Sequence, residues 1–423
     1  MIGRVKRNPK STRGKREQFH QVRAWKNHNS TPKIKQFFKT DATDHGMPIK
    51  IKNFITKIMT DKQKTMDSGI TATVDESLDS AAEEEFVPLD LSHLPSVKGH
   101  TFEGEFSFED FIKSYSAIGL QGSCLYQAIE IIRTVRTKKI PIFMGITSNI
   151  GTCGLRESMT YLTKNKLVSA VAATAGAIEE DVMKTMGDFK LGEYKNDDIA
   201  LFKSKVNRTG NILVPTRIYA QLHMFLNTLN QKLWKEAWMH GKPITDSEYI
   251  HELGKLMESY DVNRKEESFV YQAYKNNMTI YCPALMDGAI GDAIFQFCRN
   301  KNAMGISEHA AIMDNSKSTF DLITKMEQSK KVAGDVCLLA IGGSIPKHMI
   351  CNAAIFSEGA KYCVYINTST EAEGSNAGAP VSEAITWGKV HPEATSVKVQ
   401  AEATLVMPLL IAAAFQTWQP KPL

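Results

Sequence analysis

The chain has 423 residues, 43% apolar and 23% charged, which is typical of a soluble globular protein with one large or two ordinary domains. Its seven cysteines are scattered and form no C-x-x-C pair. This argues against a disulfide framework or a zinc site and favours free thiols in a reducing cytoplasm. There is no apolar run of about 18 residues and no apolar segment of a secretory signal, so we expect a cytoplasmic protein without a membrane anchor.

The positive charge is concentrated at the N-terminus. Residues 1–40 hold twelve of the 51 Lys and Arg residues and a single acid, Glu17, so this stretch carries +11 while the whole chain carries +5. Residues 1–46 are predicted to be a basic, disordered tail. The tail could contact RNA, address an organelle, be merely solvated, or precede a true start at Met47. The rest of the chain shows no basic-aromatic platform, so nucleic-acid binding is not expected as the main function.

Residues 47–85 are predicted to form an N-terminal helix followed by an acidic linker. The segment 47–65 is amphipathic, and 61–85 ends in "VDESLDSAAEEE". The catalytic body is expected to span residues 86–423.

From residue 126 the chain alternates between helical and strand patterns. Amphipathic helices are expected at 126–138, 154–167, 177–187, 289–299 and 346–359. Apolar strands with their polar turns are expected at 140–149, 168–176, 278–288, 335–344 and 362–370. The segment 187–275 has helical periodicity and is expected to cap one side. Apolar strands separated by helices predict an α/β fold, a Rossmann-like, doubly wound, mostly parallel sheet with helices on both faces and an N-terminal extension.

Small and polar residues gather where the predicted strands end. These turns read "TSN", "TAG", "MDG", "IGGS" and "NTST". In doubly wound sheets, ligands bind outside the carboxyl ends of the strands, where backbone N–H groups and helix N-termini favour phosphates. Five such turns on one edge predict a large cofactor site, although the G-x-G-x-x-G fingerprint is absent.

Near the C-terminus, "SEAITWGKV" at 382–390 places Glu383, Trp387 and Lys389 within seven positions. Taken alone, this pattern fits a solvated acid, a core tryptophan and a surface lysine. It also fits a nucleophilic amine beside an aromatic wall, because burial lowers the pKa of a lysine and leaves its amine free to attack.

Five segments decide between these interpretations. "TSNIGTCGLRESMTYL", "ATAGAIEED", "CPALMDGAIGD", "YINTSTEAEGSNAGAP" and "SEAITWGKV" together resemble the deoxyhypusine synthase family, in the same order, over residues 86–415. The resemblance implies an NAD-dependent transferase that moves the aminobutyl group of spermidine, via an imine on Lys389, to a lysine of the translation factor five-A precursor. It also implies a tetramer of two dimers, a homotetramer or a heterotetramer with a paralogue, with active sites at the dimer interface.

The resemblance also assigns roles to individual residues. Lys389 would carry the imine, and His348 would move protons, for which an imidazole is suited. Substrate-binding positions carried over from the family are Glu179, Asp292, Gly374, Ser375, Asn376, Glu383 and Trp387. Asp287 would bind on the cofactor side. Its alternative role is that of a cap on the helix that follows it. No metal site is expected, because His, Cys and Asp residues lack ligand spacing.

The cofactor positions carried over follow the strand ends. They are Ser148, Asn149, Ile150, Gly151, Thr152, Thr174, Ala175, Gly176, Glu180, Asp287, Gly343, Thr368, Ser369, Glu402 and Ala403. Glu180 and Glu402 are acids suited to ribose hydroxyls, which favours NAD over its 2′-phosphorylated form.

The sequence departs from the family pattern near the amine site. Asn376 and Ala377 stand where an aspartate and a serine are expected, Ser344 replaces a glycine, and Met349 replaces a second histidine. Two alternatives therefore stay open. One is a homospermidine synthase-type transfer to a small amine, and the other is a weakly active partner subunit that regulates a paralogue.

Overall fold

The computed structural model describes residues 89–417 except 261 and 307–310. The predicted tail at 1–46 and the helix and linker at 47–85 lie outside the described residues and stay predictions. None of the helices within the described ranges combines the length and apolarity needed to cross a membrane.

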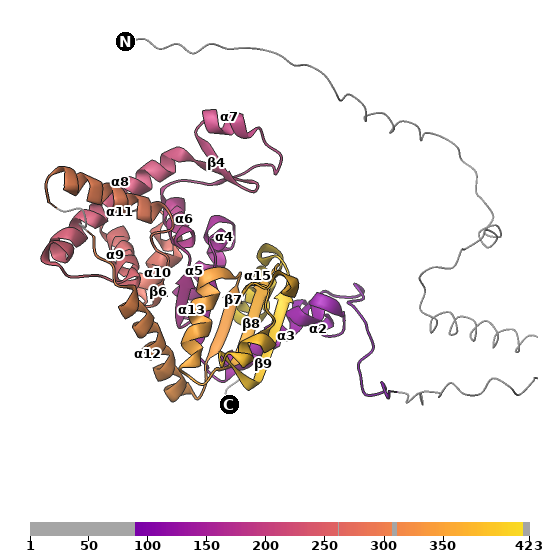
Figure 1. Cartoon of the computed structure of the whole chain (residues 1–423). Coiled ribbons are helices and arrows are strands. Elements are labelled where there is room, and N and C mark those ends of the chain that lie inside the picture. The colour runs from indigo at the N-terminus through magenta and orange to yellow at the C-terminus, as the bar shows by residue number, and fades with distance from the viewer. Residues whose placement is uncertain (1–88, 261, 307–310, 418–423) are drawn as a thin grey trace, which may run out of the picture. The chain divides into compact units, whose positions relative to one another are not determined.

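The centre of the domain is a six-stranded parallel sheet (Figure 1). Across the sheet the strands are β6 (Thr279–Tyr281), β2 (Ala170–Ala173), β1 (Ile142–Ile146), β7 (Cys337–Ile341), β8 (Ala360–Asn367) and β9 (Val390–Gln400). Counted along the chain, this order is third, second, first, fourth, fifth, sixth. It is the doubly wound order, and its direction reverses between β1 and β7. The predicted fold class is confirmed.

Helices cover both faces of the sheet, because neighbouring side chains of each strand enter different cores. Phe143 of β1 packs in one core with residues of α12 (Asn315–Ala333) and α13 (Ser344–Ile355). Met144, the next residue, packs in the other core with α3 (Leu120–Thr137). Every side chain of β1 and β7 is buried, which explains their uninterrupted apolar sequence.

A glycine lets α13 approach the sheet closely at the point where the strand order reverses. A Cβ added at Gly145 in β1 would lie 3.2 Å from the backbone of Pro346 and Lys347, in the first turn of α13. The first turn of α13 therefore lies directly against β1, beside the carboxyl end of the sheet.

The remaining helices surround this frame. They are α2 (Phe108–Ser114), α4 (Asn149–Thr152), α5 (Arg156–Lys164), α6 (Ala175–Met186), α8 (Thr216–Glu236), α9 (Asp246–Ser259), α10 (Phe269–Lys275), α11 (Ala289–Ala303), α14 (Val381–Thr386) and α15 (Ala403–Ile411). A capping box of Thr245 and Glu248 begins α9. A buried ion pair joins α5 to α6, with the Nε of Arg156 lying 2.8 Å from the Oδ1 of Asp181.

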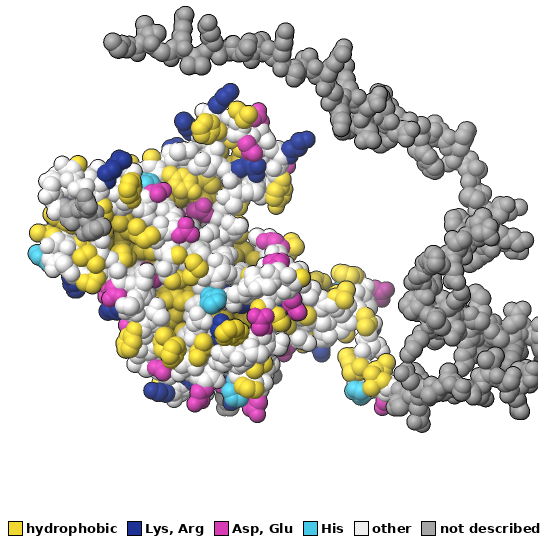
Figure 2. All heavy atoms as spheres, viewed as in Figure 1, with side chains coloured by type: hydrophobic (Ala, Val, Ile, Leu, Met, Phe, Trp, Pro, Cys, Tyr) yellow, Lys and Arg dark blue, Asp and Glu magenta, His cyan; other side chains and the backbone are white. Residues whose placement is uncertain are grey.

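The segment 187–275, in which helical periodicity was predicted, does form α8, α9 and α10, but it also contains a small antiparallel sheet that was not predicted. The strands β3 (Lys190–Leu191), β4 (Val206–Thr209) and β5 (Ile212–Pro215), with α7 (Asp198–Lys203), project from the rest of the domain (Figure 1). Lys and Arg side chains gather around this projecting part (Figure 2). Its strands are short and largely exposed, so they lack the apolar alternation that would have predicted them.

Candidate functional site

A cavity of about 340 Å³ lies at the carboxyl ends of β1, β7, β8 and β9, where the strand order reverses. This is the edge at which doubly wound sheets bind their ligands. Seven of the predicted cofactor positions line it: Asn149, Ile150, Gly343, Thr368, Ser369, Glu402 and Ala403.

Hydrogen bonds hold residues that line this cavity in place, and one buried side-chain donor has no acceptor among the described residues. The Glu402 carboxylate caps α15 by accepting from the Thr404 N–H at 2.9 Å, and Asn367 Oδ1 accepts from the Ser369 N–H at 3.1 Å. The Nδ2 group of Asn367 is buried and has no partner among the described residues. A bound ligand with acceptor oxygens would satisfy it, so the residues present fit a ribose- and phosphate-bearing cofactor. Sequence reasoning missed Asn367, although it directly precedes the predicted Thr368.

The other cofactor positions near β1 and β2 lie on α4 and α6 and at their starts, outside the lining of this cavity. Ser148 Oγ lies 2.7 Å from Thr174 Oγ1, and the Thr152 hydroxyl donates to the Glu180 carboxylate. Burial raises the pKa of Glu180, and the Thr152 bond and Lys184 oppose this effect. Gly151, Ala175 and Gly176 belong to the same two helix starts.

Two of the predicted amine-binding acids meet at the start of α11. Glu179 is buried, and its Oε1 accepts from the Ile290 N–H at 2.7 Å. Burial raises the pKa of Glu179 to about 7, with smaller contributions from Glu180 and Asp292. Asp287 is exposed, and the N-cap of α11 is Gly288, with no side-chain hydrogen bond to the first turn of the helix. The alternative that Asp287 caps this helix is therefore wrong.

A separate cavity of about 210 Å³ lies between α13 and α14, over β8. Five predicted catalytic or substrate positions line it: His348, Asn376, Glu383, Trp387 and Lys389. The predicted Gly374 and Ser375 lie outside its lining, in a turn where Ser375 Oγ accepts from the Gly378 N–H at 3.2 Å.

The local sequence "TWGKV" explains where Lys389 lies. Helix α14 ends in a Schellman motif, in which Gly388 N–H donates to Ile385 and Lys389 N–H donates to Ala384, at 2.9 and 3.0 Å. Gly388 takes φ +70°, the left-handed conformation that favours glycine. The Lys389 Nζ lies 5.6 Å from the centroid of the Trp387 ring. Trp387 is 65% exposed, so the core-tryptophan interpretation is wrong. Within one chain, the Lys389 side chain is only half-buried.

A second lysine, which sequence reasoning missed, lies in the same cavity. Lys347 is buried, its Nζ donates to the Asn376 carbonyl, and it lies 4.2 Å from the centroid of the Tyr365 ring. Burial lowers the pKa of Lys347. Burial, Lys389 and Lys347 together lower the pKa of His348, which favours its neutral, proton-accepting form. Lys347 directly precedes the predicted His348 in "PKHM", and this was the signal in the sequence that could have identified it.

The predicted site residues therefore fall into separate groups. The cavity of Lys389 and the cavity at the carboxyl ends of the strands share no lining residue among those the structure describes. Glu179 and Asp292 line neither cavity, and they lie together where α6 meets the start of α11. In the part of the chain that the structure describes, no group of three or more His, Cys, Asp and Glu residues is arranged to hold a metal ion.

Comparison with known proteins decides the family. A family model described as deoxyhypusine synthase matches residues 110–414. The chain belongs to the deoxyhypusine synthase family. A probable deoxyhypusine synthase of Pyrococcus furiosus is 36% identical over 320 residues, which cover 74% of this chain and 93% of that protein. A probable deoxyhypusine synthase of Methanocaldococcus jannaschii is 35% identical over 323 residues, covering 75% and 95%.

A solved structure supports the same family. The crystal structure of a provisionally assigned deoxyhypusine synthase from Entamoeba histolytica matches with a TM-score of 0.54 and 25% identity. The match covers 77% of this chain and 99% of that one. The resemblance to the deoxyhypusine synthase family seen in the sequence is thus confirmed over most of the chain.

Proposed function

We propose that this chain is a deoxyhypusine synthase that transfers the aminobutyl group of spermidine to a lysine of the translation factor five-A precursor. Family membership supports the reaction class. The observation that carries the proposal is the placement of Lys389, at the fixed end of α14, in a cavity with His348, Glu383 and Trp387.

The cofactor of the proposed reaction is NAD, which when bound would supply the chemistry of accepting a hydride from spermidine and giving it to the product imine. The turns after β1, β7 and β8 would hold its phosphates through backbone N–H groups, and the carboxylates of Glu180 and Glu402 would accept from ribose hydroxyls. Asn367 Nδ2, which is buried and has no partner within the described ranges, supports a ligand rich in acceptors at this edge.

Lys389 acts as the nucleophile in the proposal. Its amine forms an imine with the four-carbon unit, and 1,3-diaminopropane leaves. His348, with its lowered pKa, takes up the proton from the reacting amine. Glu383 and Asp292 would pair with substrate ammonium groups, and the exposed Trp387 ring would lie against the cationic chain.

The separation of the two cavities supports an active site shared between subunits. Within one chain the two cavities share no lining residue, and a dimer interface would bring the amine group of Lys389 from one subunit to the cofactor edge of the other. Mixing Lys389→Arg with Glu402→Ala, each inactive alone, should restore part of the activity if one site uses Lys389 from one subunit and Glu402 from the other. Absence of any restored activity in mixed oligomers would contradict the shared site.

Borohydride trapping tests the reaction directly. The full chain is incubated with NAD and spermidine labelled in its aminobutyl carbons, and then reduced. We expect a labelled adduct on wild type, mapped to Lys389, and none on Lys389→Arg. A wild-type protein that binds NAD but yields no adduct would contradict the proposed enzyme.

Asn376 favours a second candidate, transfer to a small amine. It presents a neutral amide where the family has a carboxylate, and its Nδ2 is buried with no partner in the part of the chain that the structure describes. The ammonium of Lys347 donates to its backbone carbonyl. Label appearing in homospermidine rather than in the precursor protein would support this candidate. Adduct formation only in the presence of a paralogous subunit would instead support the partner-subunit alternative.

A further inference from the structure

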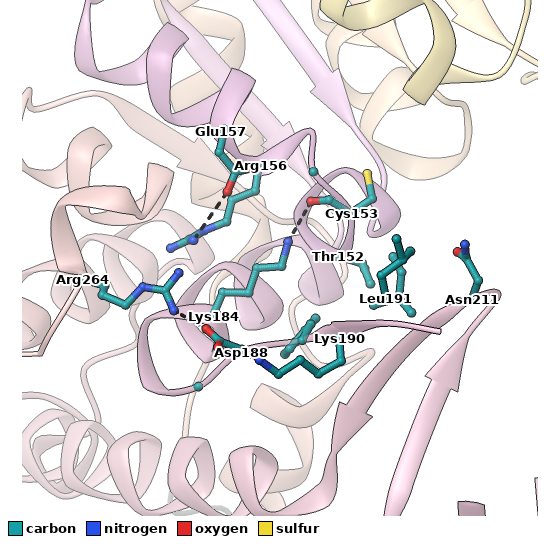
Figure 3. A pocket seen from close by; sticks show the side chains of 14 residues that line it. Thr152, Cys153, Arg156, Glu157, Lys184, Asp188, Lys190, Leu191, Asn211 and Arg264 are labelled. Atoms are coloured by element: carbon teal, nitrogen blue, oxygen red, sulfur yellow. Dashed lines mark hydrogen bonds and ion pairs between the residues drawn. The ribbon is translucent and has the colours of Figure 1, made fainter. Parts of the chain in front are cut away.

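A third cavity, of about 370 Å³, lies beside the ends of α4 and α6, against β3 and β5 (Figure 3). It contains none of the amine-site residues. Its charged lining consists of four cations and two acids: Arg156, Lys184, Lys190, Arg264, Glu157 and Asp188. The cavity therefore carries an excess of positive charge.

Most of these charges already have partners. The single carboxylate of Asp188 accepts from both Lys190 and Arg264, at 2.9 and 2.7 Å. Arg264 also pairs with Glu267 at 2.8 Å, outside the cavity lining. These contacts leave little capacity in Lys190 and Arg264 for a ligand.

Lys184 is the exception. It is half-buried, and its Nζ donates to the Cys153 carbonyl at 2.7 Å, as Figure 3 shows. No ion pair joins it to an acid in the part of the chain that the structure describes. Burial lowers its pKa, and the more distant carboxylates of Glu157 and Asp181 oppose this effect only in part. One of its three N–H donors is used, so two are left for an anion.

Helix α5 adds positive potential to the same cavity. Its N-cap, Leu155, supplies no side-chain hydrogen bond, and Gly154 and Glu157 on either side line the cavity. The first amides of an uncapped helix are donors that favour negative charge. Leu191 of β3 and Ile212 of β5 add apolar side chains to the lining of the cavity.

We propose that this cavity binds a small phosphate monoester, with Lys184 as its principal anchor. A tetrahedral phosphate accepts hydrogen bonds from several directions at once, so an ammonium and backbone amides can bind it together. The organic part of the ester would lie against Leu191 and Ile212.

This site is linked to the cofactor edge through α4. Cys153 lines both cavities, and Thr152 lines this one while donating to Glu180. Lys184 favours the ionised form of Glu180, and a bound phosphate would cancel that effect. A phosphate monoester should therefore weaken NAD binding by about fivefold, an expectation that rests on the proposed function.

Calorimetric titration of the full chain with phenyl phosphate, at constant ionic strength, tests the site. Wild type should bind, and Lys184→Gln should bind about tenfold more weakly, because one charge-assisted contact is lost. Lys203→Gln, which removes an exposed lysine on α7 outside every cavity described above, should bind like wild type. Lys184→Arg keeps the charge and should retain part of the affinity.

Two results would overturn the site: equal binding by wild type and Lys184→Gln, or no binding by folded wild type. If Lys184→Gln does not fold, loss of binding in Lys184→Met together with retention in Lys184→Arg decides the same question. NAD titrations with and without phenyl phosphate test the link, and an unchanged NAD affinity would contradict it. If NAD does not bind at all, the proposed function fails while Lys184-dependent binding of phenyl phosphate still stands.

Discussion

The backbone N–H of Lys389 donates to the carbonyl of Ala384 at 3.0 Å and closes the end of α14. This bond depends on Gly388, which takes the left-handed conformation between them. The backbone position of the proposed nucleophile is thus set by a helix-ending motif rather than by contacts of its own side chain. A local motif of this kind can hold a lysine firmly at the edge of a cavity that is still open to solvent.

Gly388→Ala tests this placement. A non-glycine residue at this positive φ costs about 1 kcal/mol, so unfolding temperature should fall modestly. Turnover should fall further, because the Lys389 amine would be displaced from its position. Gly334→Ala is a matched control: it has φ +80° in open space at the end of α12 and should lose similar stability without losing turnover. Equal turnover in both variants would contradict the positioning role of Gly388.

Asn376→Asp should strengthen binding of spermidine. The side chain lines the cavity of Lys389, and a carboxylate there would pair with a substrate ammonium where the amide offers an unpaired donor. A charge-assisted pair contributes roughly 1.5–3 kcal/mol, so KM for spermidine should fall about tenfold or more. Steady-state kinetics with labelled spermidine measure this. An unchanged KM would indicate that the amine is held by Glu383 and Asp292 without position 376.

Local patterns were sufficient to predict five strands of the main sheet but not the edge strand β9, whose residues are only partly buried. Strands such as β1 and β7 are buried on both faces, so their uninterrupted apolar sequence stands out, and the polar turns after them mark the ligand edge. The strand order was not predictable from the pattern, because it depends on which strands pair across long connections. The strands β3, β4 and β5 were missed because each has only two to four residues: β3 and most of β4 are exposed, and β5 buries only Val214.

Residues within continuous motifs were easier to place than residues brought together by tertiary packing. The predicted Asn149, Thr368 and Glu402 all reach one cavity because each follows a parallel strand. Lys347 was missed because a buried lysine between Tyr365 and the Asn376 carbonyl depends on three segments meeting. The separation of the Lys389 cavity from the cofactor edge also depends on packing, since α14 lies on a face of the sheet rather than at its edge.

Ser344→Gly should stabilise the protein. Ser344 takes φ +58° at the start of α13, in the left-handed region where a side chain is strained. Replacing it with glycine removes about 1 kcal/mol of strain, partly offset by the greater freedom of glycine in the unfolded chain. Denaturant unfolding should show a higher midpoint with an unchanged slope. A lower midpoint would mean that the serine hydroxyl makes a contact worth more than the strain.

The buried carboxyl of Glu179 should make stability depend on pH. Its pKa is raised to about 7 in the folded protein from the model-compound value of 4.5, so the folded state holds this proton more tightly than the unfolded state does. Between about pH 4.5 and 7 the folded state therefore loses stability relative to the unfolded state as pH rises, by roughly 3 kcal/mol at most.

Glu179→Gln removes this titration but keeps an oxygen that can accept from the Ile290 N–H. Its stability relative to wild type should rise by up to roughly 3 kcal/mol as pH rises from 4.5 to 7 and then stay level, measured by denaturant unfolding across that range. Wild type should bind spermidine more tightly as pH rises through 7, because ionised Glu179 then faces the substrate ammonium beside Asp292, whereas the variant should show little change. A constant difference in stability between the two proteins from pH 4.5 to 7 would show that Glu179 titrates near its ordinary value and that its buried carboxyl is not raised by desolvation.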